Sequence, residues 1–247
     1  MEKELLSEKQ IRRRVLWDKI TFVLIAIFLA LSAVFSITLI YQKTYFEVKW
    51  VNGQSMYPTF NKDAVDRYGN PKGKEGGSAN NGDKELDCVI WDKHESTMSK
   101  MERFDIVIAS QNGNSNRDLI KRVIAFPGES FYFGVGEDNG SLYIQNDSGE
   151  FVYTPQPIGD EYIKEGTYYG EFSYYKKQQV ITLKDNEYFI CGDNRGYSSD
   201  SRSFGPVTKE HVFGIVVAVV GKADAGLDDQ NNKIYKNLRI GWPRWIK

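Results

Sequence analysis

A long uninterrupted hydrophobic run spans residues 20–41, ITFVLIAIFLALSAVFSITLIY, and contains no charged residue, proline or glycine. A helix of this length crosses a hydrocarbon core about 30 Å thick. The run exceeds the hydrophobic region of a cleaved signal peptide, and no small-residue cleavage site follows it. The pattern therefore predicts a transmembrane helix over residues 20–41 rather than a buried core helix.

Positive charge gathers on the N-terminal side of this predicted helix. The basic residues before it are Lys3, Lys9, Arg12, Arg13, Arg14 and Lys19, whereas only Lys43 and Lys49 follow closely. The positive-inside rule then places residues 1–19 in the cytoplasm. We expect a single-pass protein of the cell membrane. Residues 44–247 should form one domain on the extracellular side, large enough to hold a catalytic site.

Beyond the helix, the pattern changes to short hydrophobic segments separated by Gly, Asn and Pro. Residues 45–56, YFEVKWVNGQSM, alternate between apolar and polar positions as a half-buried strand does. Further strands are predicted at residues 87–91, 104–110, 118–126, 130–135, 141–146, 187–191 and 211–221. The last of these is too short for a second membrane span. The sequence therefore predicts a mainly β extracytoplasmic domain.

Three stretches depart from this pattern. Residues 61–85 are rich in Gly, Asn and Lys and offer no apolar face, which predicts a flexible exposed insertion. The Tyr-rich residues 147–180 are weakly periodic, and we expect one short helix near residues 157–177. The C-terminal WPRWIK is either an exposed tail or a contact with membrane lipid, since Trp favours the lipid interface.

Composition narrows the functional classes. Lys and Arg total 32 against 33 Asp and Glu, so the chain lacks the basic excess of a nucleic-acid-binding protein. Cys88 and Cys191 are too few for a disulfide framework, and a single bridge between them stays open. His94 and His211 lie far apart, without the spacing of zinc ligands. We expect neither a metal nor another cofactor.

The segment GQSMYPTF, residues 53–60, raises the question of whether Ser55 is a turn residue or a nucleophile. A serine hydroxyl needs a base to accept its proton. Neither histidine lies in a motif that suits this role, and GQSMY lacks the second glycine of a nucleophile elbow. The remaining known arrangement pairs the serine with a lysine.

Lys121 is the candidate base, because it lies inside the hydrophobic segment DLIKRVIAFPGE. Strand alternation places Lys121 and Leu119 on one face, with Ile120 and Arg122 on the other. An ordinary lysine has a pKa of about 10.4, and lowering it to about 7–8 costs roughly 3–4.5 kcal/mol, which loss of hydration can supply. A lysine that protects a sheet edge from aggregation is the alternative.

The third polar segment is GDNRGYSSDSRSFGPV, residues 192–207. Asp193, Arg195, Asp200 and Arg202 can form a charge-assisted network that makes the loop rigid. Such a loop can hold Ser198 against the lysine amine. A polar loop with Asx turns is the alternative.

Together, GQSMYPT, LIKRVIAFPGE and GDNRGYSSDSRSFGPV follow an N-terminal span in an order that resembles the bacterial type I signal peptidases, or leader peptidases. The resemblance implies a membrane-anchored serine endopeptidase that removes signal peptides from secreted preproteins with small residues at −1 and −3. It implies Ser55 as nucleophile, Lys121 as general base and Ser198 as the residue that orients the lysine. Asp193, Arg195, Asp200 and Arg202 correspond to the family's scaffold.

Three positions depart from the family pattern. Gly53 stands where some members have a serine in the oxyanion hole, which leaves the backbone N–H of Ser55 and the Gly53 backbone for that role. Phe104 and Ala125 stand where many members have glycine, and we interpret both as structural differences.

The partners that this reading implies are secretory preproteins and membrane lipid. An extended substrate peptide can add as a strand beside residues 51–53 and 119–121. Val51, Met56, Leu119 and Ile120 are then the candidates for lining its side-chain pockets.

An alternative is a peptidase-like membrane chaperone, or a dedicated processing factor, for assembly of surface fibres such as pili, in contact with secretion or pilus-assembly machinery. A chaperone that had lost the chemistry should lack the serine or the lysine, and both are present. Penicillin-binding enzymes have an S-x-x-K spacing, whereas residue 58 here is Pro58. The self-cleaving Ser–Lys repressors are disfavoured by the membrane helix.

Overall fold

The computed structural model describes residues 8–63, 68, 84–112, 114–169, 179–227 and 233–246. The chain divides into two compact units, Met1–Tyr45 and Phe46–Lys247. In the first unit, helix α1 (Glu8–Tyr45) contains the predicted span and extends beyond it at both ends. By length and apolar composition, α1 is the helix within the described ranges that can cross a membrane.

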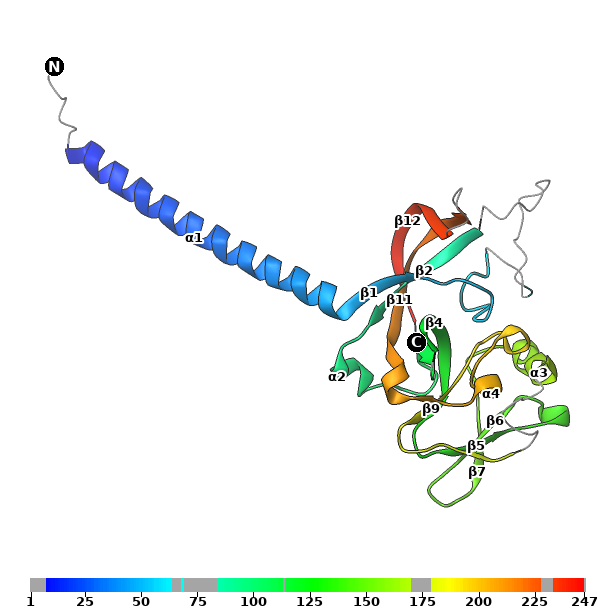
Figure 1. Cartoon of the computed structure of the whole chain (residues 1–247). Helices are drawn as coiled ribbons and strands as arrows, with labels where there is room; N and C mark the ends of the chain where they lie inside the picture. The colour runs from blue at the N-terminus through cyan, green and yellow to red at the C-terminus, as the bar shows by residue number, and fades with distance from the viewer. Residues whose placement is uncertain are drawn as a thin grey trace. The chain divides into compact units, whose positions relative to one another are not determined.

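The second unit is built mainly from two antiparallel β-sheets, as Figure 1 shows. The larger sheet has the strand order β1-β2-β11-β3-β4-β9-β10, and β12 pairs with β11. Its strands are β1 (Phe46–Trp50), β2 (Lys84–Asp92), β3 (Ile106–Gln111), β4 (Asn114–Ala125), β9 (Glu187–Cys191), β10 (Val207–Thr208), β11 (Val212–Leu227) and β12 (Lys233–Trp245). The smaller sheet, in the order β7-β6-β5-β8, contains β5 (Ser130–Phe133), β6 (Leu142–Gln145), β7 (Phe151–Thr154) and β8 (Ile181–Thr182).

Short helices connect these strands. They are α2 (Glu95–Met98), α3 (Asp160–Tyr169), α4 (Ser201–Phe204) and the 3-10 turns η1 (Gly136–Asp138), η2 (Arg195–Tyr197) and η3 (Lys209–His211). The predicted fold class is confirmed, because one apolar N-terminal helix is followed by a β-rich domain. The short helix expected in the Tyr-rich region is α3, while residues 170–178 of that region lie outside the described residues.

Each predicted strand has an observed counterpart, but β7, β8, β10 and β12 were not predicted. Strands β8 and β10 have only two residues each, too few for a periodic signal. Strand β12 carries several polar residues and Pro243, and it is held by pairing with β11 rather than by a strong hydrophobic pattern. Most of the predicted insertion at residues 61–85 lies outside the described residues.

The larger sheet is strongly curved. Strands β1 and β4 are separated by β2, β11 and β3 in the strand order, yet the Lys49 ammonium on β1 bonds to the Asp118 carboxylate on β4. In a flat sheet, four spacings of about 4.8 Å would hold these strands roughly 19 Å apart. The curvature therefore brings β1 and β4 to opposite sides of one cleft.

Candidate active site

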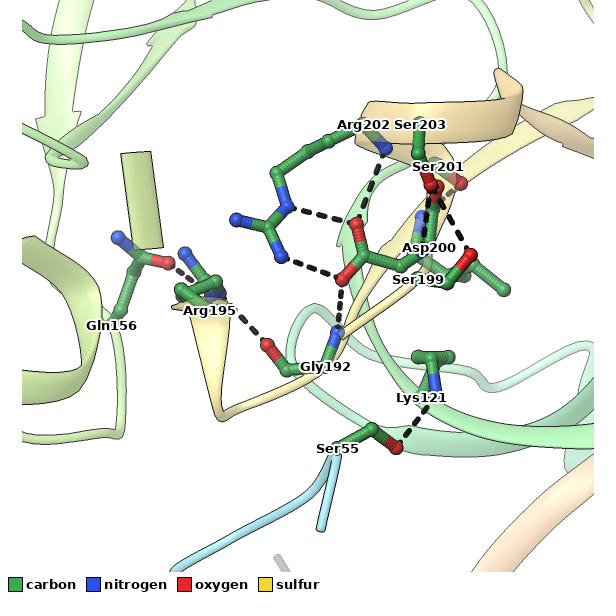
Figure 2. Close-up of polar contacts among 11 residues, drawn as sticks. Ser55, Lys121, Gln156, Gly192, Arg195, Ser199, Asp200, Ser201, Arg202 and Ser203 are labelled. Carbon is green, nitrogen blue, oxygen red and sulfur yellow. Dashed lines mark hydrogen bonds and ion pairs between the residues drawn. The ribbon is translucent and has the colours of Figure 1, made fainter. Parts of the chain in front are cut away.

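Ser55, in the turn that follows β1, meets Lys121 on β4, as Figure 2 shows. The Nζ of Lys121 lies 2.9 Å from the Oγ of Ser55, and it also donates to the carbonyl oxygen of Ile120 at 2.9 Å. Lys121 is only 3 % exposed, although it is a lysine on a strand that reaches the domain surface. The side chain is therefore largely shielded from solvent. The pair thus has the contact that proton transfer from serine to lysine requires.

The turn that carries Ser55 is held by Asn61, which is 2 % exposed. The Asn61 side-chain amide donates to the carbonyl oxygens of Val51 at 2.8 Å and Gly53 at 3.1 Å. Asn61 and Asp87 also exchange two hydrogen bonds, each between a backbone N–H and a side-chain oxygen. Gly53 has a φ of 103°, in the left-handed region that favours glycine. The first residue of the predicted insertion is therefore a buried support for the turn that carries Ser55.

The segment after β9 holds the other side of Ser55. The backbone N–H of Asn194 donates to the Ser55 carbonyl oxygen at 3.0 Å, and its side chain donates to Gln54 at 3.1 Å. A Cβ on Gly192 would lie 2.4 Å from that Ser55 oxygen and 2.2 Å from the Ser198 Oγ. Only glycine allows this close approach of the two backbones.

Asp200 and Arg202 form the inner ion pair of this loop (Figure 2). The carboxylate accepts from the Nε and NH2 groups of Arg202, both at 2.8 Å, and from the Gly192 N–H at 2.9 Å. Asp200 is fully buried, and burial alone would raise the pKa of its carboxyl. The charge and hydrogen bonds of Arg202 outweigh this effect, so the pKa is lowered. Asp200 also begins α4 with a capping box completed by Ser203.

Asp193 pairs outside the loop, with Arg122 on β4. The Nε and Nη2 of Arg122 donate to the two carboxylate oxygens of Asp193 at 2.7 and 2.6 Å. Arg122 is 3 % exposed and Asp193 is 0 % exposed. Arg195 instead donates to the Gly192 carbonyl at 3.0 Å and to the Gln156 side chain at 2.6 Å. Arg122 is thus a site residue that sequence reasoning missed. Its position directly after Lys121, on the opposite face of the strand, was the available signal.

Ser198 lies beside this site, but its hydroxyl makes no hydrogen bond of normal geometry with the described residues. It is near enough to Asp200 to contribute to the lowered pKa of that carboxyl. The orienting role of Ser198 toward Lys121 stays a prediction.

The thiols do not offer an alternative nucleophile. Cys88 and Cys191 are both free and buried. Burial raises the pKa of the Cys88 thiol to about 11 and that of the Cys191 thiol to about 12. Neither is a thiolate at neutral pH.

A cavity of about 250 Å³ opens beside Ser55 and Lys121. Val51, Leu119 and Ile120, three of the predicted pocket residues, line it. Met56, the fourth, is 1 % exposed and packs in the hydrophobic core instead. Among the described residues, strand β1 pairs only with β2, and β4 pairs with β9 only from Arg122 onward. The cleft therefore lies between two strand edges that can each accept an extended peptide.

Comparison with known proteins identifies the family. The family model for signal peptidase, peptidase S26, matches residues 19–221. The chain belongs to this family. The S26 family assignment makes the protein a serine endopeptidase, and together with the apolar helix α1 it makes the protein membrane-anchored.

Curated relatives of this S26 peptidase include signal peptidases from Bacillus subtilis and Streptococcus pneumoniae. Signal peptidase I V of Bacillus subtilis is 32 % identical over 143 residues, which cover 58 % of this chain and 80 % of the relative. Signal peptidase I U of Bacillus subtilis is 26 % identical over 197 residues, covering 78 % and 83 %. Signal peptidase I of Streptococcus pneumoniae is 30 % identical, covering 46 % and 65 %. A signal peptidase I structure from Enterococcus faecalis matches with a TM-score of 0.34 and 26 % identity, over 47 % of this chain and 95 % of that chain.

Proposed function

We propose that this S26 peptidase removes N-terminal signal peptides from secreted preproteins with a Ser55–Lys121 dyad. The observation that carries the proposal is the 2.9 Å contact between the Ser55 hydroxyl and a lysine amine that is almost entirely buried. The names of its relatives support the same substrate class. A chaperone that had lost the chemistry would have no need to keep this contact.

In the proposed reaction, Lys121 is neutral and accepts the proton of Ser55 as the hydroxyl oxygen attacks the carbonyl carbon of residue −1. The lysine, now an ammonium, protonates the leaving amine of the mature protein. A water molecule then attacks the acyl carbon while Lys121 takes its proton; the ester bond to the Ser55 oxygen breaks, and the lysine returns that proton to the serine as the new carboxyl end of the signal peptide leaves. The bond to the Ile120 carbonyl supports this role, because it holds the amine in place while the serine reacts.

The oxyanion formed at residue −1 needs hydrogen-bond donors that are already in position. We assign this role to the backbone N–H of Ser55 and the Gly53 turn. The Asn61 and Asn194 hydrogen bonds support the assignment, since they fix the backbone on both sides of the nucleophile. We assign Ser198 to orienting the lysine once substrate is bound.

The substrate peptide would lie extended between β1 and β4, with alternate side chains on one side of the strand. Residues −1 and −3 then face the same side of the cavity, to which Val51, Leu119 and Ile120 contribute apolar side chains. A cavity of about 250 Å³ shared with the catalytic groups favours small side chains at these positions. This accounts for the proposed preference for alanine.

We further propose that the N-terminus is cytoplasmic and that the catalytic domain faces the extracellular side, where membrane-tethered signal peptides present their cleavage sites. Tethering of both partners raises their local concentration. Strand β12 supports a lipid contact, because Trp242 is 98 % exposed and Trp245 73 % exposed beside Arg244. Quenching of tryptophan fluorescence by brominated lipids would test that contact, and equal quenching after Trp242→Ala and Trp245→Ala would contradict it.

The central test uses the full chain in detergent with a preprotein that has alanine at −1 and −3. Ser55→Ala and Lys121→Met should each abolish cleavage while the circular dichroism spectrum and melting temperature stay close to those of the parent. Lys184→Met, which removes an exposed ion pair with Glu187, is the matched control and should cleave normally. Cleavage by Lys121→Met at the parent rate would refute the dyad.

A further inference from the structure

An ion pair spans the proposed peptide cleft between β1 and β4. Lys49 on β1 and Asp118 on β4 line the same cavity as Ser55 and Lys121. The Lys49 ammonium donates to a carboxylate oxygen of Asp118. The pair therefore joins the two strands between which the substrate would lie.

The surroundings of Lys49 keep it charged and in place. Burial acts to lower the pKa of Lys49, but the hydrogen bond and negative charge of Asp118 outweigh it, so the pKa is raised. The Lys49 ammonium also lies 5.4 Å from the centre of the Trp91 ring and 3.5 Å from the Glu47 carboxylate. Asp118, in contrast, forms an ion pair with Lys49 alone among the described residues.

The register along β4 relates this pair to the substrate. Asp118 precedes Lys121 by three residues, and a strand advances about 3.3 Å per residue, so the pair lies roughly 10 Å from the base. If residues −1 to −3 lie beside residues 119–121, the ion pair is level with substrate position −4 or −5.

We propose that Lys49 and Asp118 are specificity-determining residues that select the substrate side chain at −4 or −5 by charge. A neutral side chain is accepted there. A charged side chain is disfavoured, because the group of opposite charge that it would meet is already paired. The inference rests on the proposed function, since it requires a preprotein segment in this cleft.

The test compares peptides that differ only in having Lys, Asp or Gln at −4, −5 or, as a control position, +2. The readout is the ratio of kcat/KM for each charged peptide to that for the Gln peptide. For the parent protein, both ratios at −4 or −5 should fall roughly two- to fivefold below one, the scale of a partly exposed ion pair. Lys49→Met frees Asp118, so the Lys ratio should rise above one and the Asp ratio should fall further.

Asp118→Asn should shift the ratios in the opposite direction, but less, because Glu47 still faces Lys49 at 3.5 Å. Lys184→Met, which lies outside the cleft, should leave every ratio as in the parent. Equal ratios in the parent, Lys49→Met and Asp118→Asn would overturn the inference, as would changes that appear only at +2. Failure of the proposed function gives a different result, because the parent would then cleave none of the peptides.

Discussion

Replacement of Asp193 by asparagine is expected to destabilise the catalytic domain strongly. Asp193 is fully buried and receives two short hydrogen bonds from Arg122, which is 3 % exposed. Asparagine offers one acceptor oxygen and turns an NH2 group toward the guanidinium donors. The Arg122 charge then stays buried without a counter-charge, which typically costs about 3–5 kcal/mol.

The expected loss can be measured as a shift in melting temperature. In a domain of about 200 residues, 1 kcal/mol corresponds to roughly 2–4 °C, so Asp193→Asn should melt roughly 6–20 °C lower. The assay is thermal unfolding of the full chain in detergent, followed by near-ultraviolet circular dichroism. The double variant Arg122→Met with Asp193→Asn should lose less stability than the sum of the single variants, because neither charge is then left alone.

Lys184→Met provides the matched control, since its ion pair with Glu187 leaves the lysine side chain 81 % exposed. Exposed pairs contribute between zero and about 1 kcal/mol, so this variant should melt within a few degrees of the parent. If Asp193→Asn also melts within two or three degrees of the parent, or if the two single effects simply add, the reasoning about the buried pair is refuted.

Three further results are expected. Phe104 has a φ of 74°, which glycine adopts more easily than alanine. Phe104→Gly should therefore be more stable than Phe104→Ala by about 1 kcal/mol and should melt at a higher temperature, although glycine is usually the less stable of the two. A more stable alanine variant would show that the backbone is unstrained. Gly192→Ala should lower kcat/KM at least about 100-fold, because its methyl group would displace the Ser55 carbonyl; near-parental cleavage would contradict that close approach. Asp200 has a lowered pKa in the fold, so its stabilising effect is present above the ordinary carboxyl value of about 3.9 and is lost as the pH falls through the lower folded value. Burial should raise the pKa of Asp200 in Arg202→Met, which moves acid unfolding to higher pH in a circular dichroism titration; an unchanged midpoint would argue against the pair.

The sequence predicted those parts of the site that depend on local pattern. The hydrophobic segment around Lys121 predicted a lysine withdrawn from water, and Lys121 is buried; its predicted neighbour Leu119 lines the cleft, but so does Ile120, which strand alternation placed on the opposite face. The pairing of Asp193 with Arg122 was not predictable in this way, because it depends on how β9 pairs with β4. The close spacing of acidic and basic residues in the loop predicted that they pair with one another. In the structure, Asp193 pairs with Arg122 on β4, and Arg195 bonds to Gly192 and Gln156.

Asn61 illustrates a second limit of sequence reasoning. It begins a polar, glycine-rich stretch, and its composition indicates an exposed loop. In the structure it is buried, because Asp87 on β2 and the carbonyl groups before Ser55 together satisfy its amide. A polar residue becomes a core residue when distant segments supply all its hydrogen-bond partners, and no window along the chain reports that.

The hydrogen bond between the backbones of Asn194 and Ser55 has a consequence for the order in which the site is assembled during synthesis of the chain. Serine and lysine are 66 positions apart, and the segment that clamps the serine arrives later still, after β9. In the proposed mechanism, a chain still being synthesised would carry Ser55 before the segment that fixes its backbone, so the site would be complete only after β9 and the residues that follow it have folded.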